Sequence, residues 1–213
     1  MNNSNNIVGL IKKKKIIAII RGITKDRILK TAEALLDGGI SIMEVTMNND
    51  DAFESIQLIN KEFEKEVLLG AGTVLTTDQV EKSYNAGAKF IVSPNIEDSV
   101  VSKTKKLNMI SIPGAFTPTE IYRAYNAGAD FVKVFPAGSL GPEYIKSIKA
   151  PLENIPLLTV GGVDLNNLKE FINAGAVGVG IGGNLVNKRL IYEGEFEKIK
   201  NIAKNYVDKL KEE

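Results

Sequence analysis

The chain has 213 residues, of which 44% are hydrophobic and 25% are charged, and its formal net charge is +1. This length and apolar content suit one sizeable core, so we expect a single domain over residues 1–213. A net charge near zero without long basic stretches argues against nucleic acid or a membrane surface as the main partner. No apolar stretch approaches membrane-spanning length, and the polar first six residues lack the core of a signal peptide, so we expect a cytoplasmic protein.

Cysteine and histidine are both absent from the sequence. Disulfides, thiolate nucleophiles and Ser-His or Cys-His catalysis are therefore excluded. An enzyme built from this chain must use Glu, Asp, Lys or Tyr for its proton transfers.

Eight short apolar runs recur along the chain, and a segment with helical periodicity follows each of them. Four lysines at residues 12–15 stand just before the first run, and we interpret them as the solvated end of a short N-terminal helix. The expected strands span residues 16–21, 40–47, 67–73, 90–94, 109–115, 131–136, 157–162 and 177–183. Eight βα units with short connections predict a (β/α)8 TIM barrel, and an open doubly wound sheet is the alternative.

Local signals mark where several helices begin and end. Thr117 and Glu120, with Pro118 at the first helical position, predict a capping box, and Thr76 with Gln79 repeats the pattern. The tetrapeptide Asn-Ala-Gly-Ala occurs at residues 85–88, 126–129 and 173–176. We expect each of its glycines to end a helix in the left-handed conformation.

Two charged residues interrupt runs that otherwise have the pattern of buried strands. Lys133 lies within Phe-Val-Lys-Val-Phe-Pro, and Glu44 lies within Ser-Ile-Met-Glu-Val-Thr-Met. Alternate residues of a barrel strand face the interior, and counting by twos leaves aliphatic residues facing the helices and places both charges inside. Lysine and glutamate side chains are rarely buried without a partner or a function. A structural ion pair, or a lysine whose amine reaches water at a strand end, is the alternative to catalysis.

Burial would disfavour the ammonium form of Lys133 and leave more free amine, which is the nucleophile that forms a Schiff base with a ketone. A nearby Glu44 carboxylate can then move protons. A buried ion pair is a poor source of stability, because desolvation cancels much of its attraction. The pair therefore favours an active site over a structural role.

Polar or bent segments follow the predicted strands, at the barrel end where enzymes of this architecture hold their active sites. Gly161 and Gly162 follow the seventh strand, and Gly182 and Gly183 follow the eighth. Barrels often bind phosphate at these two positions, through backbone N–H groups that glycine leaves accessible. Tight turns also need glycine, so a structural role for each pair stays open.

Seven ordered motifs resemble those of one enzyme family. They are EVT at 44–46, GAGTVL at 70–75, VSP at 92–94, IPG at 112–114, VKVFPA at 132–137, VGGV at 160–163 and GIGG at 180–183. Together they are similar to the 2-keto-3-deoxy-6-phosphogluconate (KDPG) and 4-hydroxy-2-oxoglutarate (KHG) aldolases, class I enzymes on a (β/α)8 barrel. The resemblance covers residues from about 16 to 188.

The resemblance implies roles for individual residues. Lys133 would form the Schiff base, Glu44 would shuttle protons and Thr73 would lie beside the keto-acid carboxylate. The pocket around a small phosphorylated keto acid would be formed by Pro94 and Phe135 and, around the phosphate, by Gly161, Gly162, Gly182, Gly183 and Asn184. The resemblance further implies a homotrimer that uses no metal and no cofactor.

One departure from the family pattern bears on the substrate. Many relatives carry arginine, a charged anchor for the substrate carboxylate, where this chain has Asn48. The resemblance implies that Arg21 supplies this charge instead, as in similar phosphogalactonate aldolases. We therefore expect the enzyme to cleave KDPG to pyruvate and glyceraldehyde 3-phosphate, KHG to pyruvate and glyoxylate, or both. The alternative substrate is 2-keto-3-deoxy-6-phosphogalactonate (KDPGal). A phosphate-binding isomerase or synthase that uses Lys133 only as an electrostatic clamp, and a catalytically silent binding barrel, are the rival hypotheses.

Overall fold

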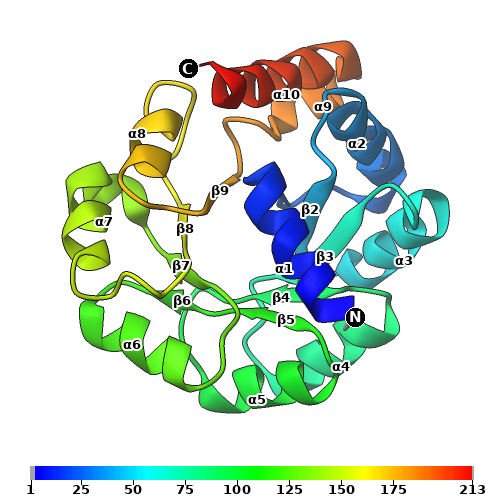
Figure 1. The fold of residues 1–213 in the computed structure, drawn as a ribbon. Coiled ribbons are helices and arrows are strands. Elements are labelled where there is room, and N and C mark those ends of the chain that lie inside the picture. Colours follow the sequence, from blue (N-terminus) through cyan, green and yellow to red (C-terminus); the bar gives the residue numbers. More distant parts are fainter. Residues whose placement is uncertain (1–2, 213) are drawn as a thin grey trace.

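The computed structural model describes residues 3–212, so Met1, Asn2 and Glu213, at the two ends of the expected domain, lie outside the described residues. A parallel sheet forms the centre of the molecule, and helices surround it (Figure 1). The strands are β1 (Ile16–Ile20), β2 (Ile42–Thr46), β3 (Leu68–Gly72), β4 (Phe90–Val92), β5 (Ile110–Ile112), β6 (Gly114–Ala115), β7 (Val132–Val134), β8 (Leu157–Val160) and β9 (Gly178–Ile181). Their spatial order is β5-β4-β3-β2-β1-β9-β8-β7-β6.

Strands β5 and β6 are two halves of one barrel strand. Only Pro113, which has no N–H to donate, separates them along the chain. β5 pairs with β4 and β6 pairs with β7, while the Lys133 N–H donates to the Pro113 carbonyl at 2.9 Å. The nine strand segments within residues 3–212 thus make eight barrel strands. The predicted (β/α)8 TIM barrel is confirmed, and the open doubly wound sheet is wrong because the first and last strands pair.

The predicted strands were too long at their carboxyl ends. β1 ends at Ile20 rather than Arg21, and β7 ends at Val134 rather than Pro136. The residues beyond these ends form the loops at the mouth of the barrel, although the Phe135 N–H still donates to the Ala115 carbonyl at 3.0 Å. Polar or glycine-rich strand ends are therefore loop residues, and binding residues are often located on such loops.

The helices lie outside the sheet, with one exception. They are α1 (Asn3–Lys14), α2 (Lys25–Asp37), α3 (Ala52–Phe63), α4 (Thr77–Asn85), α5 (Asp98–Lys106), α6 (Pro118–Asn126), α7 (Gly141–Lys149), α8 (Leu168–Asn173), α9 (Lys188–Tyr192) and α10 (Phe196–Lys211), with a 3-10 turn η1 (Ala137–Ser139). Helix α1 lies across the opening of the barrel (Figure 1). None of the helices within residues 3–212 is both long enough and apolar enough to span a lipid bilayer.

Helix α1 is the short N-terminal helix that the lysine run indicated. Three of its lysines form the exposed last turn, as expected. Ile11 of α1 belongs to the apolar cluster inside the barrel, and Ile7, Val8 and Leu10 pack against this cluster. The Ser4 hydroxyl lies 3.4 Å from the carbonyl of Asn108, just before β5. Helix α1 therefore covers the amino-terminal end of the barrel and leaves the carboxyl end for a site.

The predicted signals at the helix ends are present, except that one of the two capping boxes is only half formed. Thr117 accepts a hydrogen bond from the Glu120 N–H at 3.3 Å, and Glu120 accepts one from the Thr117 N–H at 2.8 Å, which completes the capping box. Thr76 likewise accepts from the Gln79 N–H, but the Gln79 side chain accepts from Leu75 instead, so the second box is half formed. The three repeated glycines have φ values of 104°, 96° and 107°, as predicted.

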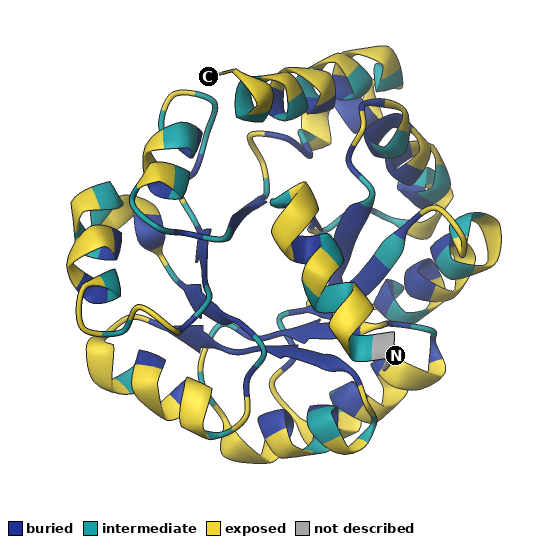
Figure 2. Ribbon diagram, in the orientation of Figure 1, coloured by how far each residue is buried: buried dark blue, intermediate teal, exposed yellow. Residues whose placement is uncertain are grey.

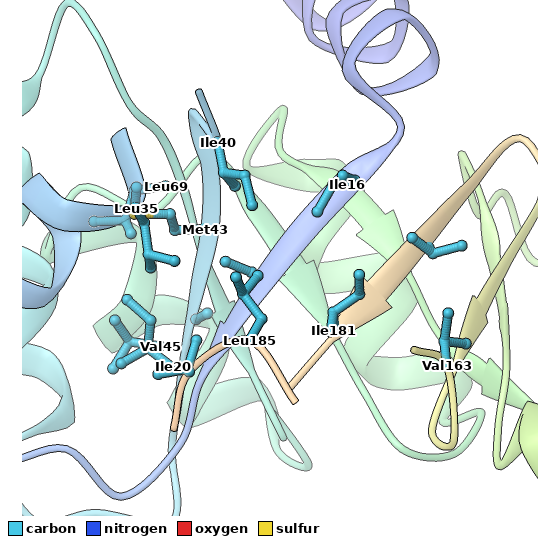
Figure 3. Close-up of a cluster of buried hydrophobic side chains, with 14 of the residues drawn as sticks. Ile16, Ile20, Leu35, Ile40, Met43, Val45, Leu69, Val163, Ile181 and Leu185 are labelled. Carbon is cyan, nitrogen blue, oxygen red and sulfur yellow. The ribbon is translucent and has the colours of Figure 1, made fainter. Parts of the chain in front are cut away.

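The apolar core has two layers. Strands and inner helix faces are buried, whereas the outer helix faces are exposed (Figure 2). The larger cluster lies between sheet and helices, and Figure 3 shows Met43 and Val45 of β2 within it. Ile42 of β2 and Phe131, just before β7, belong instead to the cluster inside the barrel. The side-chain alternation predicted for these two strands is therefore confirmed.

Candidate active site

Glu44 and Lys133 occupy the middle of β2 and β7 and face the barrel interior. Only 3% of Glu44 and 4% of Lys133 is exposed to solvent. They line one small cavity whose remaining walls are Ile17, Ile19, Val92, Ile112, Leu158, Val160 and Gly180. The structure thus brings together the two charges that interrupt the strand patterns, in surroundings that are otherwise apolar.

Burial shifts both groups toward their neutral forms. It lowers the pKa of the Lys133 amine, an effect that Glu44 opposes and the Arg21 charge reinforces. It raises the pKa of the Glu44 carboxyl, and the positive charges of Lys133 and Arg21 offset part of this rise. The two side chains form no direct ion pair with each other, so the structural ion-pair interpretation of this pair is not supported. The near-complete burial of Lys133 also argues against an amine that simply reaches water.

The ring of Phe135 positions the Lys133 amine. The Nζ atom lies 4.7 Å from the ring centroid, within the range of a cation–π contact. The same ring lies close to the loop after β8, since a Cβ built at Gly161 would be 3.1 Å from it. Phe135 therefore lies between the amine and the glycine-rich loop.

Gly72 makes room for the Glu44 carboxyl group. It ends β3, which pairs with β2 in the register Glu44 to Gly70 and Thr46 to Gly72. A Cβ built at Gly72 would lie 2.8 Å from the carboxyl carbon of Glu44 and closer still to Oε1. Sequence reasoning placed Gly72 only among the bent strand ends and missed this role. A glycine inside a strand is a signal for close approach of another group, but it does not identify the group.

Thr73 has a backbone conformation that is unfavourable for its side chain. Its φ is 58°, in the left-handed region where a β-branched residue is an outlier. Such strain costs about 1–3 kcal/mol and is typical of functional sites. Thr73 and Pro94 follow β3 and β4 at the carboxyl end of the barrel, but neither lines the two cavities described in this section. Their expected contacts with substrate stay predictions.

A second cavity of about 230 Å³ opens beside the first one. Ile19, Val160 and Gly180 line both, so the two spaces adjoin each other. Its walls also contain seven of the predicted site residues: Arg21, Phe135, Gly161, Gly162, Gly182, Gly183 and Asn184. Arg21, which the family pattern assigned to the missing carboxylate anchor, therefore lies among the glycines expected around a phosphate.

The backbone conformation favours glycine in one of the two glycine pairs but not in the other. Gly161 and Gly162 have φ values of 84° and 77°, so the turn after β8 itself favours glycine. Gly182 and Gly183 do not have positive φ. A Cβ built at Gly183 would meet nothing within 4 Å, and one at Gly182 would only reach Ile19 at 4.0 Å. The fold explains the first pair but not the second, and the phosphate-binding role expected for Gly182 and Gly183 stays a prediction.

Asn184 links the two glycine loops. Its Nδ2 atom donates to the Val163 carbonyl at 3.2 Å, which joins the loop after β9 to the loop after β8. The Gly138 N–H donates to the Gly161 carbonyl at 2.7 Å and joins the loop after β7 as well. The loops at the mouth are therefore held together by hydrogen bonds. Asn48, at the position where the family often has arginine, is exposed in the loop after β2.

Comparison with known proteins agrees with this geometry. The family model "KDPG and KHG aldolase" matches residues 7–202. The 2-dehydro-3-deoxy-6-phosphogalactonate aldolase of Escherichia coli strain K12 is 40% identical over 174 residues, 81% of this chain and 85% of that protein. The 2-dehydro-3-deoxy-phosphogluconate aldolase of Treponema pallidum is 37% identical over 187 residues, 86% of this chain and 89% of that protein.

A solved structure is also similar. The KDPG aldolase of Legionella pneumophila, with pyruvate captured as a covalent carbinolamine, superposes with a TM-score of 0.87 at 27% identity, over 92% of this chain and 96% of that one. Sequence and fold agree over most of the chain. The chain belongs to the KDPG and KHG aldolase family of carbon–carbon lyases.

Proposed function

We propose that this protein is a class I aldolase that cleaves a phosphorylated 2-keto-3-deoxy sugar acid into pyruvate and glyceraldehyde 3-phosphate. The observation that carries the proposal is the buried Lys133 amine, which burial shifts toward its uncharged form, beside the Glu44 carboxyl group in one cavity. An uncharged amine is the form that attacks a ketone. The covalent capture of pyruvate in the Legionella pneumophila relative supports the same chemistry here.

The proposed reaction begins when the Lys133 amine adds to the C2 ketone and the resulting carbinolamine loses water. The iminium so formed is an electron sink next to C3. Glu44 removes the proton of the C4 hydroxyl, the C3–C4 bond breaks, and its electron pair moves toward the iminium as the aldehyde leaves. Glu44 then returns its proton to C3 of the enamine. Water adds to the iminium, pyruvate is released, and the Lys133 amine is regenerated. No cofactor is required by these steps.

The raised pKa of Glu44 suits this double role. A carboxyl group with a pKa above its usual range gains and loses a proton more readily near neutral pH, where both directions are needed. The apolar walls of the cavity keep bulk water from the enamine. Glu44→Gln is expected to lower turnover by about 100- to 10,000-fold, which is typical for the loss of a positioned acid–base group.

The neighbouring cavities support a proposed position for the rest of the substrate. With C2 at Lys133, we propose that an extended chain passes Phe135 and brings its terminal phosphate to Gly182 and Gly183, where a built Cβ would meet nothing closer than Ile19 at 4.0 Å. Thr73, at the strand end next to Glu44, is proposed to bind the carboxylate of the keto acid. The strained backbone of Thr73 supports a functional reason for this residue.

The galactonate-derived acid KDPGal is the second candidate substrate. Two observations favour it over KDPG: Asn48 replaces the arginine that many relatives carry, and the phosphogalactonate aldolase of Escherichia coli is 40% identical to this chain. KHG, which has no phosphate, is a third. A coupled assay with lactate dehydrogenase, which detects pyruvate, ranks the three substrates by kcat/KM.

The decisive experiment for the mechanism is reduction of the enzyme with borohydride in the presence of pyruvate. We expect the mass of one reduced pyruvate adduct on the wild-type chain and none on Lys133→Ala. Lys105→Ala serves as a matched control, because that lysine pairs with Asp130 at 2.6 Å outside the cavity and should leave the adduct intact. Labelling that persists in Lys133→Ala would refute the proposed nucleophile.

We also propose that the protein assembles as a homotrimer, as the family resemblance implies. Leu75, Phe116 and Tyr122 expose 46%, 41% and 54% of their surface. Leu75 precedes α4, Phe116 precedes α6 and Tyr122 belongs to α6, on the side of the barrel where α5 lies between these two helices (Figure 1). Large apolar side chains in such positions are typical of contacts between protomers. Light scattering after gel filtration measures the assembly, and a monomer mass would contradict this proposal.

A further inference from the structure

A third cavity of about 300 Å³ adjoins the glycine-lined pocket. The two cavities share Ile19, Arg21 and Gly183, and the third one also reaches Asn187 and Lys188 at the start of α9. Gly183, at which the fold leaves room for a side chain, thus lines the same opening as Arg21 and Lys188. A third cationic residue of this lining, Arg189, is already paired with Glu193 at 3.2 Å.

Lys188 is directed toward the loop that follows β1. A Cβ built at Gly22 would lie 2.5 Å from the Nζ atom of Lys188 and 3.1 Å from its Cε atom. The ammonium group therefore rests against the backbone of Gly22, which directly follows Arg21. The absence of a side chain at Gly22 creates the space that Lys188 fills.

In the described part of the chain, neither of these two cations is in contact with a carboxylate. Among residues 3–212, neither Arg21 nor Lys188 forms an ion pair. Like charges that are held near each other without a carboxylate repel, and an anion bound between them would remove this repulsion. A lysine ammonium is a compact point charge suited to phosphate, and a guanidinium offers several donors in a fixed plane.

Helix α9 is fixed against the loop that carries Arg21. The Tyr192 hydroxyl, one turn after Lys188, accepts a hydrogen bond from the Thr24 N–H at 3.3 Å and lies 3.3 Å from the Thr24 hydroxyl. The two cations are therefore attached to segments that are already joined in the absence of ligand. Such preorganisation reduces the entropy lost when an anion binds.

We propose that Lys188 and Arg21 form a cation clamp that recognises the terminal phosphate dianion of the substrate at Gly182 and Gly183. The clamp rests on the proposed aldolase function and deepens it. Lys188 makes the enzyme selective for phosphorylated keto acids over the unphosphorylated KHG. Because the clamp binds the end of the substrate remote from the C3–C4 bond, its loss acts on KM more than on kcat.

The test compares Lys188→Gln with wild type on the better phosphorylated acid and on KHG. We expect kcat/KM for the phosphorylated acid to fall by about 10- to 100-fold, the usual effect of removing one partner from a charged hydrogen bond. The value for KHG should stay within about twofold, since it makes no phosphate contact. Lys204→Gln is the matched control, because Lys204 is an exposed α10 residue without an ion pair among the described residues, and it makes the same change in net charge.

Inorganic phosphate is the probe for a second measurement that needs no turnover. Its affinity, measured by calorimetry, should weaken about tenfold or more in Lys188→Gln and stay unchanged in Lys204→Gln. Equal phosphate affinity in all three proteins, or an equal loss of activity on both substrates, would overturn the clamp.

The clamp and the aldolase chemistry fail in distinguishable ways. Borohydride trapping of pyruvate depends on Lys133 and involves no phosphate. Normal trapping together with unchanged phosphate selectivity in Lys188→Gln overturns only the clamp. Absence of trapping in the wild type overturns the proposed function itself.

Discussion

Replacing Gly72 with alanine adds one methyl group beside the Glu44 carboxyl group. The added Cβ would lie 2.8 Å from the carboxyl carbon, whereas carbon atoms in contact are normally about 3.5–4.0 Å apart. The carboxyl group must therefore move by about 1 Å, since the paired strands β2 and β3 hold the backbone in register. Lys133 lies on β7, which does not pair with β3.

A displacement of about 1 Å in a catalytic group costs on the order of 100-fold in rate. That factor corresponds to about 2.7 kcal/mol of transition-state stabilisation. We therefore expect Gly72→Ala to lower kcat by about two orders of magnitude in the coupled pyruvate assay. Borohydride trapping of pyruvate should persist, because formation of the first imine depends on the Lys133 amine.

Two comparisons make this prediction specific. Gly9→Ala, on the exposed face of α1 with nothing within 4 Å of the added Cβ, should retain full activity. In a Glu44→Gln background, Gly72→Ala should cause little further loss, because residues that act through one group are not additive. Near-normal turnover in Gly72→Ala, or a full additional loss in the double variant, would refute the reasoning.

Three further predictions concern stability and binding. The pKa of Glu44 is raised in the folded protein, so its contribution to stability is present below the ordinary glutamate pKa and is lost as pH rises through the raised value. In urea unfolding, Glu44→Gln should therefore gain stability relative to wild type as the pH rises from about 4 to about 8. A difference in stability that stays constant with pH would contradict this. Thr73→Gly should stabilise the fold by about 1 kcal/mol, because it removes the strain of the left-handed backbone conformation, and it should lower the affinity for pyruvate. A lower melting temperature of this variant would count against strain at Thr73. Gly183→Ala should stabilise the fold by about 0.4–1 kcal/mol, since the fold leaves room for the methyl group, and it should raise KM for the phosphorylated substrate. An unchanged KM would contradict the proposed contact of the phosphate with Gly183.

The barrel and its reactive pair were predictable because both depend on local periodicity. The alternation of residues along β2 and β7 is visible in the sequence, and it places Glu44 and Lys133 on the same interior face once the sheet is closed. Proline at a first helical position and glycine at helix ends are also local signals, and they mark the ends of several of the eight units.

Other features depend on contacts between distant segments, which periodicity does not contain. The role of Gly72 follows from the register between β2 and β3, and the position of Lys188 follows from the packing of α9 on the loop after β1. The two glycine pairs have the same local sequence signal, and only their φ values separate a turn requirement from an open surface. The closure of the barrel by α1 likewise requires the three-dimensional arrangement.

The central claim is that the buried Lys133 amine, which burial shifts toward its uncharged form, captures a ketone covalently. Its most direct test is the rate of pyruvate trapping by cyanoborohydride across a pH series, with the labelled peptide identified by mass spectrometry. The account predicts label on Lys133 alone, with a rate that stops rising at a pH below the usual titration range of lysine, because burial lowers the pKa of this amine. Label on another lysine, or a rate that rises through the ordinary lysine range, would contradict it.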